Sequence, residues 1–396
     1  MAKRRFELPG VHELSKEQER VLRLPLDGRH LVIGGPGTGK SVVALLRTRR
    51  HLQYRDRGEY IFLVYNVLLN AASSQLFDTQ LNSKTWITWF KEVFRRILGR
   101  ETPMQGGSLY NIDWDAVKTT IATYPGNWNA PPIDFIIIDE GQDMPKDFYT
   151  ALMELGCKHF FVVADQNQTI TEQHCSRKEL EDALVIEHGA TLCLTSNYRN
   201  SYPVARLAKE FYPDDPASPP VELPLARRSV KTPLRVEYGG EAKLSFNGLI
   251  RKIVLTADRD PSKLIGVIAP DNIVREKYYT EFMKALNCTT PALKLDNEKP
   301  KVTTYKSGDK YKYPFDEGGI FVINAASCKG LEFEIVFIAD IHAFKWSHAH
   351  TDMLRRKFYV MVSRAKEQIF LLQEAGRNIA VESILPKDES ILAYWR

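Results

Sequence analysis

Residues 34–41 read GGPGTGKS, a run whose residue types suit the binding of a phosphate group. Glycines let backbone N–H groups curve around an anion, a lysine brings positive charge to it, and the closing serine hydroxyl can ligate Mg²⁺. The apolar residues 31–33 before the run suit a buried strand, and 42–50 suit a helix whose N-terminus would also face the anion. The pattern predicts a phosphate-binding loop whose nucleotide contacts come from Gly35, Gly37, Thr38, Gly39, Lys40 and Ser41.

A second run whose residue types could take part in catalysis is FIIIDEGQD, residues 135–143, in which apolar residues are followed by two acids. This is the arrangement in which Asp139 holds Mg²⁺ together with Ser41, while Glu140 orients and deprotonates an attacking water. The alternative is a strand that simply ends in an acidic turn. The position of the run, roughly one hundred residues after the phosphate loop, favours the catalytic interpretation.

Composition is that of a globular protein, with 396 residues, 44% hydrophobic and 26% charged, which is enough chain for two or three domains. The net charge of +5 permits a nucleic-acid partner without arguing for one. No apolar run is long enough to span a bilayer, and MAKRRFELPG has no apolar core behind its charges, so we expect no secretory signal. Scattered cysteines without a C-x-x-C pair predict reduced thiols and a cytoplasmic protein; they are Cys157, Cys175, Cys193, Cys288 and Cys328.

Three histidines, His342, His348 and His350, lie close together in the sequence. A metal site would need a nearby cysteine or carboxylate pattern of known spacing, and none completes the group. A polar loop is the better interpretation.

The elements that must position these residues alternate between strands and helices, which predicts an α/β fold with two parallel-sheet domains. Residues 99–132 look like a small insertion in the first domain, and the proline-rich run 213–233 like a surface loop. We expect helices at 12–24, 84–98 and 275–286, strands at 60–65, 159–169, 191–201 and 264–270, two strands within 319–340, and a helix feeding a last strand within 353–372.

Two segments allow a structural interpretation beside a functional one. Ser15 and Gln18 fit a capping box at a helix start, which by itself explains the glutamine. The tryptophans of 84–98 could stack on bases, although an aromatic stripe at helical spacing is more often core.

Seven segments, taken in order, resemble the UvrD/Rep-like branch of superfamily 1 helicases. The resemblance implies two tandem RecA-like (P-loop NTPase) domains that use ATP and Mg²⁺, with domain 1 at 1–192 and domain 2 at 193–396. The boundary follows from the family, where the NYR residues already belong to the second domain. The segments are that around Gln18, GGPGTGKS, DEGQD, VVADQNQTI, LTSNYRNS, INAASCKGLEFEIVF and FYVMVSRAKE.

The resemblance also implies roles by position. Gln18 would read the adenine edge, and Tyr198 would stack on the base. Gln166 would sense the γ-phosphate and couple it to the bound strand.

From the second domain, Arg199 and Arg364 would contact the γ-phosphate, and Glu332 would line the nucleotide site. An arginine finger on a moving domain ties hydrolysis to closure. The alternative for Arg364 is a solvated surface arginine.

Strand contacts are implied for Tyr65, Asn66, Thr85 and Trp86. Ala326 stands where the family usually carries a histidine, which implies altered coupling. The stretch between the strands at 264–270 and 321–324 leaves no room for the family's large accessory subdomain.

We therefore expect a nucleic-acid-dependent ATPase that moves on single-stranded DNA, with 3′→5′ polarity implied by the family. It would be a minimal helicase or the motor of a DNA-repair or phage-defence complex with a partner protein. Two alternatives stay open: an ATP-gated switch or partner-binding subunit with little translocation, and an enzyme directed to RNA.

Overall fold

The computed structural model describes residues 6–54, 59–77, 81–124, 133–169, 174–187, 189–226, 231–288, 293–306, 313–345 and 351–395. The chain divides into two compact units. The first unit comprises Leu8–Thr195 and Asp215–Val221, and the second comprises Ser196–Asp214 and Glu222–Arg396 together with Met1–Glu7. The boundary predicted after residue 192 falls inside a strand of the first unit, β6 (Leu192–Leu194).

The first unit is built on a six-stranded sheet in the order β3-β2-β4-β5-β1-β6, and each of these described strands is parallel to its neighbours. Its strands are nearly continuous apolar runs because both faces of the sheet are covered. Their bounds are β1 Arg29–Gly34, β2 Tyr60–Val64, β3 Ser83–Thr85, β4 Phe135–Ile138, β5 His159–Ala164 and β6 Leu192–Leu194.

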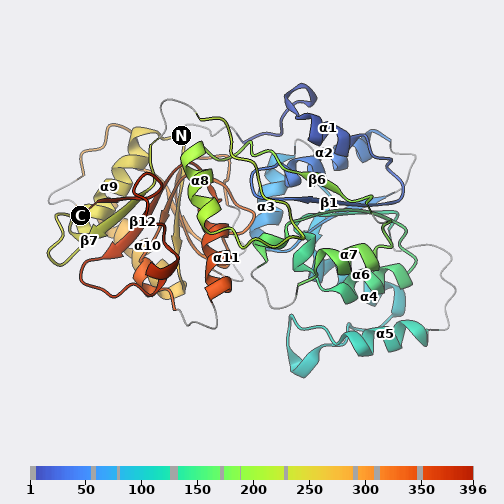
Figure 1. Cartoon of the computed structure of the whole chain (residues 1–396). Coiled ribbons are helices and arrows are strands. Elements are labelled where there is room, and N and C mark those ends of the chain that lie inside the picture. The colour runs from blue at the N-terminus through green and yellow to red at the C-terminus, as the bar shows by residue number, and fades with distance from the viewer. Residues whose placement is uncertain are drawn as a thin grey trace. The chain divides into compact units, whose positions relative to one another are not determined.

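Helices cover the two faces of this sheet (Figure 1). Residues of α2 pack on one face and residues of α4 and α6 on the other, each in its own apolar cluster. The helices are α1 Lys16–Leu22, α2 Lys40–Gln53, α3 Val67–Leu76, α4 Trp86–Leu98, α5 Trp114–Ala122, α6 Lys146–Glu154 and α7 Arg177–Ala183.

The predicted helices 12–24 and 84–98 are shorter than expected. A short 3-10 turn, Val11–Glu13, precedes α1, and β3 precedes α4. In the predicted insertion, an antiparallel bridge joins Met104 to Ile112 before α5, and residues 125–132 lie outside the described part.

The second unit has a seven-stranded sheet in the order β13-β7-β12-β11-β8-β10-β9, again with parallel neighbours throughout its described strands. The bounds are β7 Leu234–Tyr238, β8 Leu264–Ala269, β9 Val302–Thr304, β10 Gly319–Asn324, β11 Phe333–Ile338, β12 Ala365–Glu374 and β13 Ala393–Trp395. The two parallel α/β sheets correspond to tandem RecA-like domains, as the sequence predicts.

The helices of the second unit are α8 Tyr202–Glu210, α9 Phe246–Arg259, α10 Asn272–Asn287 and α11 Thr351–Val362. Apolar residues of α9 and α10 share one cluster with the sheet. Phe211, which follows α8, packs on Phe358 of α11. Between β8 and β10 the described chain forms α10 and β9.

The described part of the proline-rich run is mostly exposed or half-buried, as expected of a surface loop. Residues 215–221 belong to the first unit, and Ser218 within them is fully buried. Its hydroxyl accepts a hydrogen bond from the Gln166 N–H at 2.9 Å, which holds this return segment in place.

None of the five cysteines, all of which lie in the described chain, is joined in a disulfide. Within the described part of the chain, the helices are too short or too polar for any of them to cross a membrane.

Candidate nucleotide site

The phosphate loop lies between the end of β1 and the start of α2, as predicted. Gly37 and Gly39 adopt left-handed backbone conformations, with φ of 79° and 87°, which glycine adopts without steric cost. The Thr38 hydroxyl and the Lys40 ammonium donate to the Gly35 carbonyl at 2.8 and 3.0 Å. No side chain caps α2 at Gly39, and such helix-start N–H groups are natural anion ligands.

Gln18 connects α1 to this loop. Its carbonyl oxygen accepts from the Ser15 N–H at 3.0 Å, which completes the capping box, and its amide donates to the Thr38 carbonyl at 3.0 Å. The structural interpretation of Gln18 is therefore confirmed. The same side chain lies against the phosphate loop, where a role in nucleotide binding is still a prediction.

The two acids follow β4, which lies one strand away from β1 on the other side of β5. Asp139 is fully buried and Glu140 nearly so. The Glu140 backbone has φ of 56°, a left-handed conformation that is strained for a residue with a Cβ. Its N–H donates to Asp139 Oδ1 at 3.0 Å.

The electrostatics of Asp139 suit a bound cation. Burial and, after it, the neighbouring Glu140 raise the pKa of Asp139 to about 6, although the Ser41 hydroxyl and Lys40 oppose the rise. Its Oδ2 atom is buried and makes no hydrogen bond with any described residue. A divalent cation beside Ser41 would satisfy this oxygen and stabilise its charge.

Gln142, which sequence reasoning did not single out, holds the second acid. Its amide donates to Glu140 Oε2 at 2.6 Å, and its carbonyl oxygen accepts from the Asp165 N–H at 2.9 Å. The side chain is fully buried. It thus links the acidic turn after β4 to the end of β5.

Asp165 and Gln168 form the third part of the site, after β5. An Asp165 oxygen lies 3.8 Å from Lys40 Nζ and accepts from the Gln168 amide at 2.6 Å. Burial raises the pKa of Asp165, and the charge of Lys40 opposes this effect. The loops after β1, β4 and β5 therefore meet at the carboxyl edge of the sheet, where ligands of such folds bind.

Gln166, the predicted sensor, has a different environment. In the amide orientation that satisfies both partners, its side chain donates to the Cys175 carbonyl at 3.3 Å and accepts from the Arg177 N–H at 3.2 Å. These bonds direct it towards the start of α7. Gln168 is the glutamine of this loop whose side chain bonds the Asp165–Lys40 pair.

In the second unit, three predicted residues gather at the amino-terminal edge of β11 and β12. Arg199 forms an ion pair with Glu332, which immediately precedes β11. Arg364 immediately precedes β12 and is 2% exposed, so it is not a solvated surface arginine. Its guanidinium donates to the carbonyls of Val360 and Leu331 at 3.0 and 3.4 Å. Tyr198, by contrast, is 57% exposed.

The predicted strand contacts follow two paired strands, since Val64 of β2 aligns with Thr85 of β3. Asn66 caps α3 by accepting from the Leu69 N–H at 2.8 Å. The Thr85 hydroxyl donates to Thr88 at 2.8 Å, and Tyr65 is half-buried against the core.

Trp86, the fourth predicted strand contact, lies in the core of the first unit. It is 6% exposed and packs edge-on against Phe148 and parallel to Trp114. This packing favours a core role for Trp86, and its contact with a bound strand stays a prediction.

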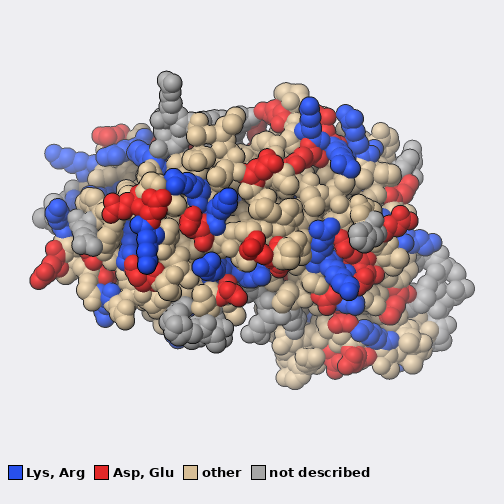
Figure 2. Space-filling model, viewed as in Figure 1, with Lys and Arg blue, Asp and Glu red and all other residues tan. Residues whose placement is uncertain are grey.

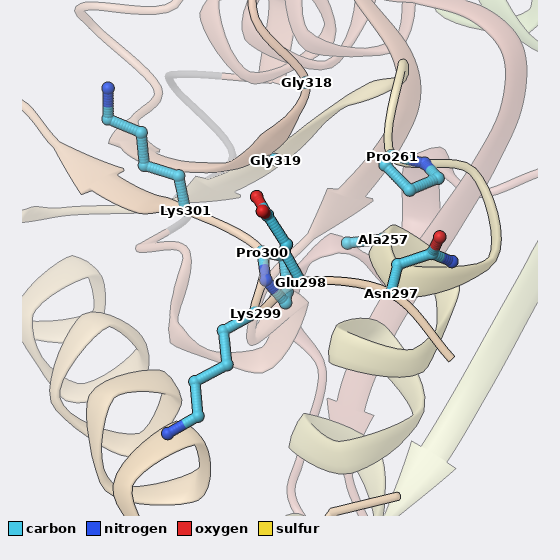
Figure 3. Close-up of a pocket in the computed structure, with 9 residues that line it drawn as sticks. All are labelled: Ala257, Pro261, Asn297, Glu298, Lys299, Pro300, Lys301, Gly318 and Gly319. Atoms are coloured by element: carbon cyan, nitrogen blue, oxygen red, sulfur yellow. The ribbon is translucent and has the colours of Figure 1, made fainter. Parts of the chain in front are cut away.

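Figure 2 shows that Lys, Arg, Asp and Glu side chains are interspersed over the face in view, without one large patch of a single sign. A pocket of about 230 Å³ in the second unit is lined by nine residues and contains none of the predicted nucleotide ligands. In Figure 3, Lys299 and Lys301 of this pocket extend in opposite directions. Lys301 forms an ion pair with Glu317 at 3.0 Å.

His342 lies in a 3-10 turn and accepts from the Glu374 N–H at 3.2 Å. His348 and His350 lie outside the described residues. Within the described residues, no cluster of three or more His, Cys, Asp or Glu side chains is placed to hold a metal ion.

Comparison with known proteins gives two family models that match parts of the chain. Residues 319–372 match the model of the UvrD-like helicase C-terminal domain, and residues 29–221 match that of the Schlafen group 3 DNA/RNA helicase domain. One similar solved structure is the C-terminal domain of a possible DNA helicase from Lactobacillus plantarum WCFS1. It has 14% identity and a TM-score of 0.33, and the match covers 50% of this chain and 98% of that one. No curated protein matches the chain by sequence.

The match over residues 29–221 contains the phosphate loop, both acids and Gln168, and the match over residues 319–372 contains Glu332 and Arg364. The chain is therefore similar to UvrD-like helicases over residues 319–372 and to Schlafen group 3 helicases over residues 29–221.

Proposed function

We propose that the protein is an ATP-dependent translocase on single-stranded DNA, with the minimal motor of a superfamily 1 helicase. The observation that carries the proposal is the convergence of half-buried Ser41 with buried Lys40, Asp139 and Glu140, with Asp139 Oδ2 left without a hydrogen bond from the described residues. This is the donor set of an NTP-hydrolysing site.

The roles of the cluster follow from its chemistry. Lys40 would neutralise phosphate charge in both the ground state and the transition state. Ser41 and Asp139 would hold Mg²⁺, which stabilises negative charge on the phosphates when bound. Glu140 would take the proton of the attacking water, and Gln142 would keep its carboxylate in position.

The remaining nucleotide contacts are proposed from the resemblance and from their placement. In domain 1, residues 1–192, the base and phosphates of the nucleotide would be contacted by Gln18, Gly35, Gly37, Thr38 and Gly39. In domain 2, residues 193–396, Tyr198 would stack on the base and Glu332 would line the site. Arg199 and Arg364 would meet charge that develops on the γ-phosphate, an effect worth about 10³-fold or more in rate for an arginine finger.

Gln168 is our proposed link between the nucleotide and the bound strand, in the role that the sequence suggested for Gln166. The amide of Gln168 bonds Asp165, which in turn lies against Lys40. Ala326, on the loop after β10, replaces the family's histidine, so we propose weaker coupling from the second domain.

Single-stranded DNA is the proposed substrate, bound around Tyr65, Asn66 and Thr85, and the cytoplasm is the proposed location. RNA is the alternative, since the model matched by residues 29–221 is described as a DNA/RNA helicase domain. A partner protein in a DNA-repair or phage-defence complex belongs to the same proposal.

The test is ATP hydrolysis by the purified chain with no nucleic acid, single-stranded DNA, single-stranded RNA or duplex. Single-stranded DNA should stimulate hydrolysis most, with affinity falling as salt rises because phosphate contacts release counterions. Lys40→Ala should abolish hydrolysis under every condition, and Glu140→Gln should bind ATP without cleaving it.

Equal rates with and without nucleic acid would contradict the motor and favour an ATP-gated switch. Stimulation by RNA alone would move the proposal to RNA. Normal single-turnover cleavage by Glu140→Gln would remove Glu140 from its role as base.

A further inference from the structure

Asn200 lies in the turn between β6 and α8 and is 6% exposed. Its side-chain nitrogen donates to two backbone carbonyls, those of Ser363 at 3.1 Å and Ala365 at 2.5 Å. These two residues flank Arg364 in the chain. One amide group therefore holds the backbone on both sides of the proposed arginine finger.

The orientation of this amide is fixed by its partners. Carbonyl oxygens can only accept, so the nitrogen must face Ser363 and Ala365, and Asn200 Oδ1 accepts from the Asn197 amide at 3.0 Å. Both N–H donors of the side chain are thus used on the finger segment.

The neighbouring residue extends the attachment along the start of β12. The Ser201 N–H donates to the Lys366 carbonyl at 2.6 Å, and its hydroxyl donates to the Glu367 carbonyl at 2.9 Å. The turn at 197–201 is consequently attached to residues 363–367, although the two segments are far apart in the sequence.

We propose that Asn200 is a positioning residue for Arg364, an inference that rests on the finger role in the proposed function. The side chain of Arg364 starts at a bend between α11 and β12, so a small backbone shift there is amplified at the guanidinium. The same turn carries Tyr198 and Arg199, and Asn200 makes that turn and the finger segment one rigid body.

The hydrogen-bonding chemistry of Asn200 predicts a ranking of its variants by loss of hydrolysis rate, and this ranking differs from the one that packing alone would predict. Asn200→Asp preserves shape but points a carboxylate oxygen at two carbonyl oxygens, so it should be at least as damaging as Asn200→Ala. If the side chain merely filled space, the isosteric aspartate would be the milder change.

The experiment measures single-turnover ATP hydrolysis and ATP affinity, with saturating single-stranded DNA, for Asn200→Ala, Asn200→Ser, Asn200→Asp, Arg364→Ala and the double variant Asn200→Ala/Arg364→Ala. Asn200→Ala should lower the hydrolysis rate by about 10- to 100-fold, the scale of a small misplacement of a catalytic group. ATP affinity should change by less than about threefold, since the interaction acts in the transition state.

The double variant should be no slower than Arg364→Ala, because a displaced finger and a missing finger fail in the same way. Asn297→Ala is the matched control: it removes one side-chain bond to a backbone carbonyl, that of Asp258, elsewhere in the same unit. It should hydrolyse ATP at the normal rate.

Thermal unfolding of each variant identifies any that do not fold, and Asn200→Ser then carries the test, since a hydroxyl has one donor for two carbonyls. Additive losses in the double variant, or an active Asn200→Asp, would overturn the proposal. A fully active Asn200→Ala beside an inactive Arg364→Ala would overturn this inference alone, whereas a fully active Arg364→Ala would overturn the finger role in the proposed function.

Discussion

The side-chain amide of Gln142 donates to the Glu140 carboxylate at 2.6 Å while its other end accepts from the Asp165 N–H at 2.9 Å. Glu140 has a left-handed backbone, which costs free energy and persists only where the surroundings hold it. The glutamine supplies such a hold for the carboxylate and ties it to the end of the next strand.

Gln142→Ala should therefore lower kcat by about 10- to 100-fold while ATP affinity stays within about threefold, because the proposed base loses its orientation rather than its charge. Single-turnover hydrolysis and nucleotide binding measure the two effects separately. Gln373, a buried glutamine of the second unit whose amide bonds Tyr394, provides the control variant Gln373→Ala. An equal loss of rate in both variants would contradict a specific role for Gln142.

The two glutamines after β5 should behave differently when replaced by alanine. Gln168→Ala should reduce the stimulation of ATPase by single-stranded DNA, since its amide bonds Asp165 beside Lys40. Gln166→Ala should mainly lower the melting temperature, since its side chain joins the backbone of Cys175 and Arg177. Steady-state rates with and without DNA distinguish them, and the reverse pattern would restore Gln166 as the sensor.

Asp139 should make the free energy of unfolding decrease as pH rises, which is opposite to the usual effect of a carboxylate. Its pKa is raised from 3.8 to about 6, chiefly by burial. Between about pH 4 and pH 6 the folded state therefore keeps a proton that the unfolded state releases, so the contribution of Asp139 to stability falls as pH rises. At pH 7, Asp139→Asn should raise the free energy of unfolding by on the order of 1–3 kcal/mol, although it removes hydrolysis.

Urea unfolding without Mg²⁺ at several pH values from 4 to 7 measures this difference, which should vanish towards pH 4. Asp388→Asn is the control of opposite sign, because Ser390 lowers the pKa of that exposed carboxylate. It should gain no stability at pH 7. A pH-independent gain from Asp139→Asn would show that the ionisation of Asp139 is not its cause.

Trp86→Ala should act on folding and not on a stacked base. Removing a large aromatic side chain from a core lowers the free energy of unfolding by about 3–5 kcal/mol. Tyr110→Ala, at a 67% exposed aromatic of the same unit, should leave stability within about 0.5 kcal/mol. Chemical unfolding and affinity for single-stranded DNA per folded molecule check this, and a stable variant with weakened DNA binding would support the stacking role.

The parts of the site that sequence predicts are those encoded by adjacent residues. The phosphate loop needs glycines, a lysine and a serine in one run, and Asp139 and Glu140 need a strand directly before them. The roles of Gln142 and Asn200 could not be predicted from the sequence. Gln142 bonds Asp165 and Asn200 bonds Ser363, and each partner lies in a distant segment that only the fold brings close.

Two features that the sequence does not show also have physical causes. Trp86 is of a residue type that can stack on a nucleic-acid base, but its helix directs the side chain to Phe148 in the core. The proline-rich run is a surface loop, as its composition suggests, but nothing local in the sequence shows that Ser218 within it is buried against the Gln166 backbone.

The final prediction concerns duplex separation. The isolated chain should translocate 3′→5′ on single-stranded DNA, since two RecA-like domains that alternate their grip are sufficient for stepping. Opening a duplex also requires about 1.4 kcal/mol per base-pair step. The family's large accessory subdomain, which helps to engage the junction, has no counterpart in the described chain between β8 and β10, where α10 and β9 lie. Unwinding by the chain alone should be weak and short-range.

Strand displacement on duplexes with a 3′ or a 5′ single-stranded tail measures this prediction, with Lys40→Ala as the inactive control. Short duplexes with 3′ tails should open slowly and long ones should not, and a partner that supplies the missing surface should extend the range. Efficient unwinding of long duplexes would show that the accessory subdomain is dispensable here. A preference for 5′ tails would reverse the polarity, because the tail that supports loading defines the direction in which the motor approaches the junction.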